Sequence, residues 1–204
     1  MGEPDLVAAI AALRQGKAVV VPTDTVYGVA ALPTVPGATR QLFALKQRGE
    51  HHPLAVLVAD LDQALGLIDQ PDGDVRSLMD RAWPGPLTLV LRRSPAALHL
   101  ELGGDDGSIG VRCPDHAQVR ELARVVGPLA TTSANRHGEP TPATAEAAAA
   151  TLAGPAQEII DGGCCAGAPS TVVDCTVRPW RVLRSGAYPV NLIEGIADGE
   201  VPAW

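Results

Sequence analysis

Apolar residues follow two different spacings along this chain, and these spacings predict where helices and strands lie. Residues 5–15 carry apolar side chains at the spacing of one helix face, and so do residues 117–126. We expect helices at residues 5–15, 61–69, 74–82, 117–126 and 144–152, and one more within residues 33–46. Short, mostly apolar runs between Gly, Pro or polar residues predict strands at residues 17–21, 54–58, 87–91, 108–112, 129–132, 158–161, 171–175 and 181–183.

Strands and helices alternate through most of the chain, which is typical of an α/β fold. We therefore predict a twisted, mixed sheet with flanking helices. Residues 1–186 form one domain in this interpretation, because no repeat and no linker divides them. Residues 187–204 form a C-terminal tail that could fold over a pocket as a lid.

Residues 19–28 join a buried strand to a polar loop. Three valines and a proline are followed by four polar side chains, Thr23, Asp24, Thr25 and Tyr27. In open α/β sheets, ligands bind where strands end in loops. The stretch is therefore either one wall of a ligand pocket or an ordinary strand followed by a capped turn.

Other segments also place cations or hydroxyl groups beside predicted strands and helix ends. Lys46 and Arg48 follow a helix, whereas Ser133 and Asn135 follow a strand and point to one side if the chain is extended. Each segment alone also fits a local role, such as a helix C-terminus that attracts cations, or a turn. Together they predict one positively lined pocket, because Lys and Arg are suited to phosphate. Its candidate residues are Thr25, Lys46, Arg48, Arg112, Ser133, Asn135, Thr171 and Arg184.

The composition narrows the possible functions. A formal net charge of −7 argues against a general, charge-driven grip on nucleic acid, although it allows a local basic pocket. No P-loop, dinucleotide fingerprint or Gly-x-Ser-x-Gly elbow occurs. The cysteines and histidines show no metal-ligand spacing, so we predict no metal site built from protein ligands. Without a basic leader or an apolar run of about 20 residues, we expect a soluble, cytoplasmic protein that does not bind membranes.

Several motifs occur in an order that resembles the YrdC-type threonylcarbamoyl-AMP synthase family. They are Pro22-Thr-Asp-Thr-Val-Tyr-Gly28, Lys46-x-Arg48, Pro53-Leu54, Trp83-Pro-Gly-Pro-Leu-Thr-Leu89, Gly110-Val-Arg-x-Pro114, Ser133-Ala-Asn135 with Gly138, Ser170-Thr-Val-Val-Asp174 and Leu183-Arg184. The resemblance implies a YrdC-like fold with a large, positively lined cavity. It implies that L-threonine, bicarbonate and ATP give threonylcarbamoyl-adenylate and pyrophosphate. It also implies a tRNA-modifying threonylcarbamoyl transferase complex as a partner.

The resemblance further implies roles for individual side chains. Lys46 and Arg48 take the catalytic role of meeting nucleotide phosphate, and the full set of ATP contacts is Lys46, Arg48, His52, Ser108, Ser133, Asn135 and Arg184. The threonine contacts are Thr25, Arg112 and Thr171, with the Arg112 guanidinium on the carboxylate. Two positions depart from the family, since His52 stands where Asn is frequent and Leu57 stands where longer members have a histidine. We also expect this chain to be a short member, without the additional C-terminal domain of those longer members.

In the implied reaction the threonine amine is carboxylated, and a carbamate oxygen then attacks the α-phosphorus of ATP. The protein would contribute positioning and cationic stabilisation, with Mg²⁺ held largely by phosphates and water. We assign no general base and interpret Asp24 and Tyr27 as residues that shape the turn. The main alternative is an RNA-binding or ribosome-assembly paralogue without synthase activity. Another is the carbamoyl-transferring domain of hydrogenase maturation proteins.

Overall fold

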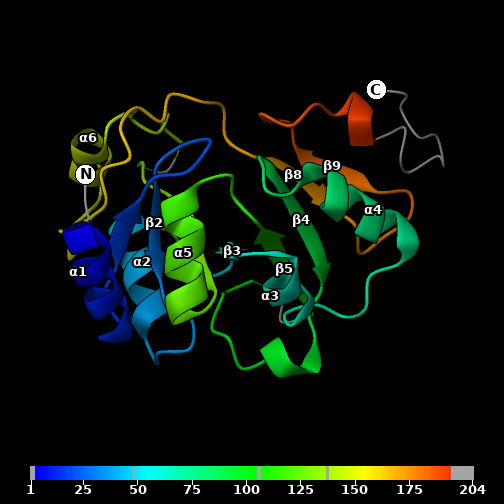
Figure 1. The fold of residues 1–204 in the computed structure, drawn as a ribbon, viewed down its shortest axis with the longest axis horizontal. Helices are drawn as coiled ribbons and strands as arrows, with labels where there is room; N and C mark the ends of the chain where they lie inside the picture. The colour runs from blue at the N-terminus through cyan, green and yellow to red at the C-terminus, as the bar shows by residue number, and fades with distance from the viewer. Residues whose placement is uncertain (1–2, 48, 105–106, 137, 194–204) are drawn as a thin grey trace.

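The computed structural model describes residues 3–47, 49–104, 107–136 and 138–193, with side chains from residue 6 onward. Within this part, one nine-stranded sheet has the order β7-β1-β2-β6-β3-β5-β4-β8-β9 (Figure 1). The strands are β1 (Val19–Val21), β2 (Gly28–Ala31), β3 (Ala55–Leu57), β4 (Leu87–Arg92), β5 (Ser108–Arg112), β6 (Leu129–Ser133), β7 (Glu158–Ile159), β8 (Thr171–Asp174) and β9 (Arg181–Arg184). The helices are α1 (Glu3–Arg14), α2 (Ala38–Lys46), α3 (Leu61–Leu65), α4 (Gly73–Ala82), α5 (Ala117–Val126) and α6 (Ala145–Ala150), with a short 3-10 helix at Pro95–Ala97. Parallel and antiparallel pairs both occur, which confirms the predicted mixed sheet.

The sequence does not predict β2. This strand pairs antiparallel with β1, so that Val21 lies opposite Gly28 and the polar residues between them form the loop of a hairpin. The signal for β2 is weak because its four residues, Gly-Val-Ala-Ala, include only one β-branched side chain. The helix predicted at residues 61–69 is also wrong in length, since α3 ends at Leu65 and Gly66 follows it.

Side chains of β4 alternate between the two faces of the sheet. Its three leucines point into the main apolar cluster, whereas Thr88 and Val90 line a cavity on the opposite face. The register places Val90 opposite Gly110 of β5, and Gly110 lines the same cavity. One face of the central sheet is thus apolar core, and the other is available to a ligand.

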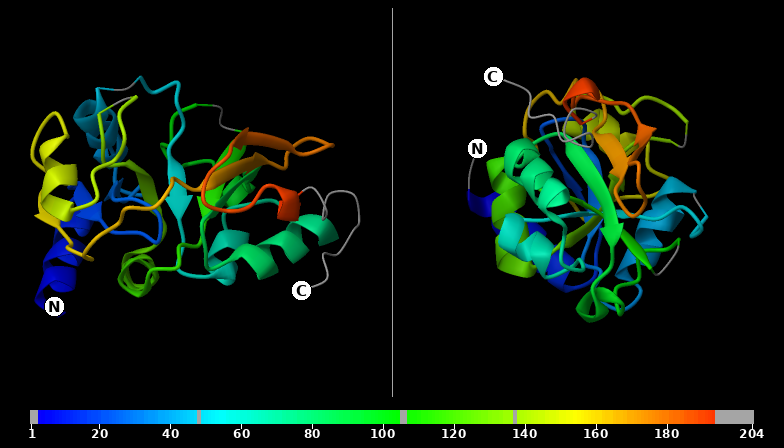
Figure 2. Two further views of the ribbon diagram at one scale, coloured as in Figure 1. Left: turned by 90° about the horizontal axis from the view of Figure 1, so that it is seen from above. Right: turned by 90° about the vertical axis from the view of Figure 1, so that its right-hand side faces the viewer.

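Helices cover both faces of the sheet. α1 and α5 pack with β1 in one apolar cluster that includes Leu13, Val21 and Leu122. α2, α4 and α6 contribute to a larger cluster that includes Leu42 and Leu78. α1, α2, α5 and α6 gather at one end of the molecule and α3 and α4 at the other, and the views in Figure 2 show how the strands twist between the two ends. None of the described helices has the length and apolar character needed to cross a membrane.

The first part of the predicted tail packs into the core. Tyr188 and Ile193 are 8% and 2% exposed and belong to the main apolar cluster. The Thr171 hydroxyl donates to the Tyr188 carbonyl at 2.7 Å and accepts from the Gly186 and Tyr188 amides. Residues 187–193 therefore continue the domain beyond residue 186, whereas residues 194–204, on which a lid would depend, lie outside the described part of the chain.

Candidate functional site

A cavity of about 440 Å³ opens on the face of the sheet that carries Thr88 and Val90. Its walls come from the loop between β1 and β2, from strands β3 to β6, and from residues in and beside β8 and β9. Among the described residues that line it, the cations are Arg93, Arg112 and Arg184, and the carboxylate is Glu139. The described lining is therefore positive overall, as the resemblance implies.

Arg112 ends β5 and has only 5% of its surface exposed. Its Nη2 donates to Asp24 Oδ1 at 2.6 Å, and its Nη1 donates to Thr25 Oγ1 at 2.9 Å. Its Nε donates to the Gly85 carbonyl at 3.0 Å. Burial lowers the pKa of the Arg112 guanidinium, and the nearby Asp24 carboxylate opposes that shift. The sequence predicts a paired arginine here, and Asp24 is its carboxylate partner.

The loop that carries Asp24 and Thr25 is held in place from two sides. Within the loop, the Thr23 hydroxyl donates to the Val26 carbonyl at 2.6 Å and accepts from the Val26 amide. From outside, Gly167 donates its amide to the Thr25 carbonyl at 3.0 Å. A Cβ at position 167 would lie 2.8 Å from that carbonyl oxygen, so only glycine allows this approach. Asp24 consequently has an exposed backbone but an inward carboxylate, with a side chain that is 14% exposed.

Tyr27 connects the same loop to the Gly-rich segment 162–169. Its hydroxyl donates to the Gly163 carbonyl at 2.6 Å and accepts from the Gly162 amide at 3.0 Å. Burial is the main cause that raises the pKa of Tyr27 to about 12, so the phenol stays protonated and keeps donating at physiological pH. The predicted turn-shaping role of Tyr27 agrees with these contacts.

Lys46 braces the loop that follows β6. Its Nζ donates to the Ser133 carbonyl at 2.7 Å, to Asn135 Oδ1 at 2.5 Å and to the Asn135 carbonyl. Ser133 and Asn135 line the cavity, whereas Lys46 lies behind them and is 5% exposed. The next residue, Gln47, has φ 50°, a left-handed conformation that costs energy in a non-glycine residue. The structure thus brings Lys46, Ser133 and Asn135 together across a separation of 87 to 89 residues.

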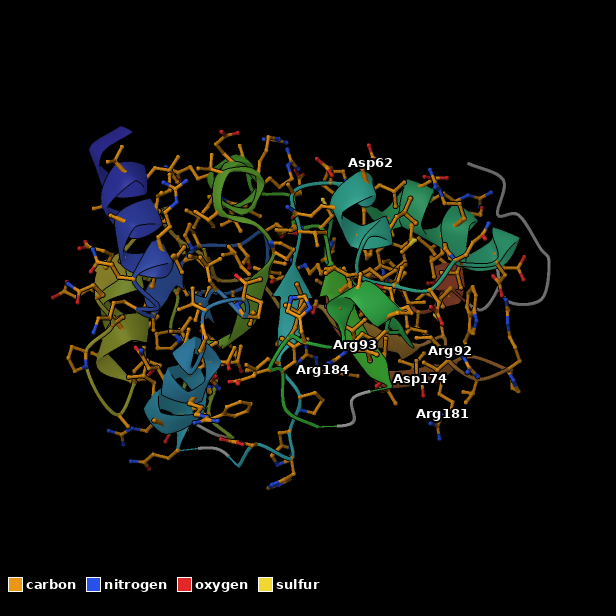
Figure 3. The ribbon with its side chains drawn as sticks, turned by 90° about the horizontal axis from the view of Figure 1, so that it is seen from below. Asp62, Arg92, Arg93, Asp174, Arg181 and Arg184 are labelled. Carbon is orange, nitrogen blue, oxygen red and sulfur yellow. The ribbon has the colours of Figure 1, made fainter. Side chains whose placement is uncertain are left out.

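Arg184 and Arg93 approach the cavity from β9 and from the end of β4. Arg184 donates through Nε to the Ser170 carbonyl and through Nη2 to Ser170 Oγ, both at 3.0 Å. Ser170 Oγ in turn lies 2.9 Å from the Thr88 hydroxyl. Arg93 is 5% exposed and donates to the Ser108 carbonyl at 3.3 Å and to the Leu100 carbonyl at 3.2 Å. Both arginines are labelled in Figure 3.

The other candidate residues fall into three groups. Ser108 lines the cavity, and so does Leu57, whereas His52 does not, although its neighbour Pro53 does. Arg48 lies outside the described residues. Thr171 is 0% exposed and does not line the cavity. Its hydroxyl instead forms hydrogen bonds with the backbone of residues 186–188. This geometry favours an anchoring role for Thr171 over the threonine contact that the resemblance implies.

Sequence reasoning overlooked three residues of the site: Asp24 as the partner of Arg112, Ser170 as the partner of Arg184, and the buried Arg93. For Asp24, the available sequence signal is the position of Arg112 at the end of a predicted strand, because an arginine buried there needs an anion. Arg93 follows Arg92 at a strand end, and the strand alternation could have shown that adjacent arginines differ in direction. Among the described residues, no group of three or more His, Cys, Asp or Glu side chains could hold a metal ion.

The sequence profile of the Sua5/YciO/YrdC family, described as "Telomere recombination", matches residues 11–186. A Mycobacterium tuberculosis protein, provisionally named a threonylcarbamoyl-AMP synthase, is 40% identical over 190 residues, which cover 92% of this chain and 87% of that protein. The threonylcarbamoyl-AMP synthase of Bacillus subtilis is 36% identical over 196 residues, which cover 95% of this chain and 57% of that protein.

Solved structures agree with this similarity. The crystal structure of Pyrococcus abyssi Sua5 complexed with L-threonine superposes with a TM-score of 0.86 at 36% identity, covering 94% of this chain and 56% of that one. Escherichia coli YciO superposes with a TM-score of 0.80 at 24% identity, which shows the shared fold. The chain thus spans just over half the length of the Bacillus and Pyrococcus proteins. These matches confirm the predicted family: the chain belongs to the Sua5/YciO/YrdC family.

Proposed function

We propose that this protein is a threonylcarbamoyl-AMP synthase, which converts L-threonine, bicarbonate and ATP into threonylcarbamoyl-adenylate and pyrophosphate. One observation carries the proposal most directly. Arg112 and Thr25, which form a buried cluster with Asp24 that suits a small zwitterion, line the same cavity as the Ser133–Asn135 loop braced by Lys46. The names of the relatives support it, as does the structural similarity to a Sua5 that binds L-threonine.

At the Arg112 end, the guanidinium receives the threonine carboxylate. Asp24 and the Gly85 carbonyl hold the guanidinium plane, so its remaining N–H groups are already aimed when substrate arrives. The Thr25 hydroxyl, bonded to both Arg112 and Thr23, gives the substrate an adjacent polar contact. Thr25 and Arg112 thus keep the threonine-binding roles that the resemblance implies.

At the opposite end, Ser133 and Asn135 orient the nucleotide and Lys46 adds positive charge behind them. Arg184 adds positive charge where phosphate charge develops during attack on the α-phosphorus, and Arg48 keeps the phosphate contact that the resemblance implies. Mg²⁺ accompanies ATP, held by phosphate oxygens and water. The unstable adenylate passes to a tRNA-modifying threonylcarbamoyl transferase complex.

Release of pyrophosphate tests the proposal. We expect release from ATP only when L-threonine and bicarbonate are both present, with threonylcarbamoyl-adenylate detected by mass spectrometry. Release without threonine would contradict the substrate assignment. Salt-sensitive binding to duplex RNA without any turnover would favour the alternative of an RNA-binding paralogue.

A further inference from the structure

His116 directly precedes helix α5 and is not among the residues that line the cavity. Its imidazole meets two other segments of the chain at Gly162. A Cβ at position 162 would lie 2.4 Å from the Cβ of Pro22 and 3.1 Å from the Nε2 of His116, so a glycine is needed for the three segments to approach. The Gly162 amide also donates to the Tyr27 hydroxyl. His116 therefore packs at the base of the β1–β2 loop, which carries Asp24.

The environment of the His116 ring favours its neutral form. Nδ1 is buried and has no hydrogen-bond partner among the residues that the structure describes. A neutral imidazole can leave Nδ1 as an acceptor, whereas an imidazolium carries an N–H donor at both nitrogens. A buried donor without an acceptor costs free energy. Burial acts in the same direction, because it lowers the pKa of His116.

Three charged groups act on His116. Burial is the largest cause of its lowered pKa, and Arg120 of α5 adds to it, whereas the carboxylates of Asp24 and Asp115 oppose it. Asp115 is already paired with Arg120 at 3.1 Å, at the surface. The proline and the glycine that meet the ring bring no charge. Asp24 is therefore the acceptor that a protonated His116 would attract.

Asp24 already has a partner at the threonine end of the cavity. Its Oδ1 accepts from Arg112 Nη2 at 2.6 Å, and this bond orients the guanidinium that receives the threonine carboxylate in the proposed function. A carboxylate that turns toward a protonated His116 weakens this bond, because one negative charge then attracts two cations. A neutral His116 leaves the Asp24 carboxylate to Arg112.

We propose that His116 is a positioning residue for threonine: its neutral ring holds the base of the β1–β2 loop and leaves Asp24 on Arg112, and its protonation weakens threonine binding. This inference rests on the proposed function for the identity of the amino acid. The affinity for threonine should fall as the pH falls through the range in which His116 takes up a proton. Because burial lowers the pKa of His116, this range lies below that of an exposed histidine.

Binding of L-threonine to the full-length protein tests this role. Titration calorimetry would compare the affinities between about pH 7.5 and about pH 5, and we expect that of the wild type to fall by about tenfold. His116→Gln cannot be protonated, so its affinity should be close to that of the wild type at the higher pH and should stay constant at the lower pH. His99→Gln, at an exposed histidine that does not line the cavity, is the matched control and should keep the pH dependence of the wild type.

Binding of AMP separates a positioning role from a merely structural one. The phosphate of AMP titrates in the same way in every variant, so the AMP affinity of His116→Gln should equal that of the wild type at each pH. Equal losses of threonine and AMP affinity in His116→Gln would overturn the inference. So would an acid-induced loss of threonine affinity that persists in His116→Gln, or its absence from the wild type.

A second measurement needs no variant and covers the case in which His116→Gln does not fold. By reciprocity, if protonation weakens threonine binding about tenfold, saturating L-threonine makes His116 about tenfold harder to protonate. NMR titration of the imidazole signals of the wild type, with and without L-threonine, measures this change, and the His99 signal should not respond. An unchanged titration of His116 in a protein that binds threonine would overturn this inference alone. A wild type that binds no threonine at any pH would contradict the proposed function itself.

Discussion

The positive charges of the arginines at the two ends of the cavity are balanced in different ways. At the threonine end, Arg112 and Asp24 form a buried ion pair with no net charge, and their side chains are 6% and 14% exposed. At the other end, Arg184 has only the neutral groups of Ser170 as described hydrogen-bond partners. A free amino acid is a zwitterion without net charge, whereas ATP is a multiply charged anion. The net charge at each end therefore matches the ligand that we place there.

The two ends of the cavity also differ in how rigidly their arginines are held. Arg112 makes three hydrogen bonds to three different residues, so its orientation is fixed before any ligand arrives. Pre-organisation of this kind reduces the entropy lost on binding a small, weakly charged substrate. A polyphosphate interacts strongly enough with cations to orient them, which is consistent with the looser attachment of Arg184.

The comparison predicts the largest effect for Arg112. In Arg112→Met the Asp24 carboxylate stays buried without its cation, a situation that costs about 3–5 kcal/mol. We expect threonine-dependent pyrophosphate release to fall by at least about a hundredfold at low threonine, together with a lower melting temperature. Arg120→Met, at an arginine of α5 whose side chain is 25% exposed, is the matched control and should change neither. If Arg112→Met retained the threonine affinity of the wild type, the assignment of threonine to the Arg112 end of the cavity would be contradicted.

Lys46 gives the next largest effect. Lys46→Met removes an ammonium that bonds three oxygens of Ser133 and Asn135, and charged hydrogen bonds contribute about 1.5–3 kcal/mol each. We expect weaker ATP binding, measured calorimetrically, and a lower melting temperature, with threonine affinity nearly unchanged. The other lysine of the chain, Lys17, is exposed, so Lys17→Met serves as the control. Loss of threonine affinity equal to the loss of ATP affinity would contradict the separation of the two ends.

A substitution at Asp24 tests whether the charge balance of the Arg112–Asp24 pair contributes to threonine binding. Asp24→Asn keeps the shape and one hydrogen-bond acceptor but leaves the charge of Arg112 unbalanced. We expect the KM for threonine to rise by about tenfold, corresponding to about 1.4 kcal/mol, with kcat changing less. Asp115→Asn breaks an exposed ion pair with Arg120 and should leave both constants unchanged, because such pairs contribute little. An equal fall in kcat would indicate a role in the chemical step instead of positioning.

The sequence predicts the helices and strands around this site better than the contacts between its side chains. Helix α5 and strand β4 follow from local periodicity, because each buries one face against the core. The pairing of Asp24 with Arg112 joins residues 88 positions apart and depends on strand order, which local patterns do not contain. For Thr171 the sequence predicts a contact that the structure does not favour. Its place in a polar motif suggests a ligand contact, but its hydroxyl forms hydrogen bonds with the backbone of Gly186 and Tyr188.

Thr171 gives the smallest predicted effect and decides between those two interpretations. Thr171→Val removes a buried hydroxyl that bonds Tyr188 and Gly186, and leaving these groups unpaired costs about 1–3 kcal/mol. We expect chemical denaturation to show this loss of stability, while the KM for threonine changes by less than about twofold because Thr171 does not line the cavity. Thr171→Ser retains the hydroxyl and should recover most of the stability. A large rise in the KM for threonine in Thr171→Val, with stability unchanged, would instead return Thr171 to the substrate and extend the threonine end of the cavity as far as β8.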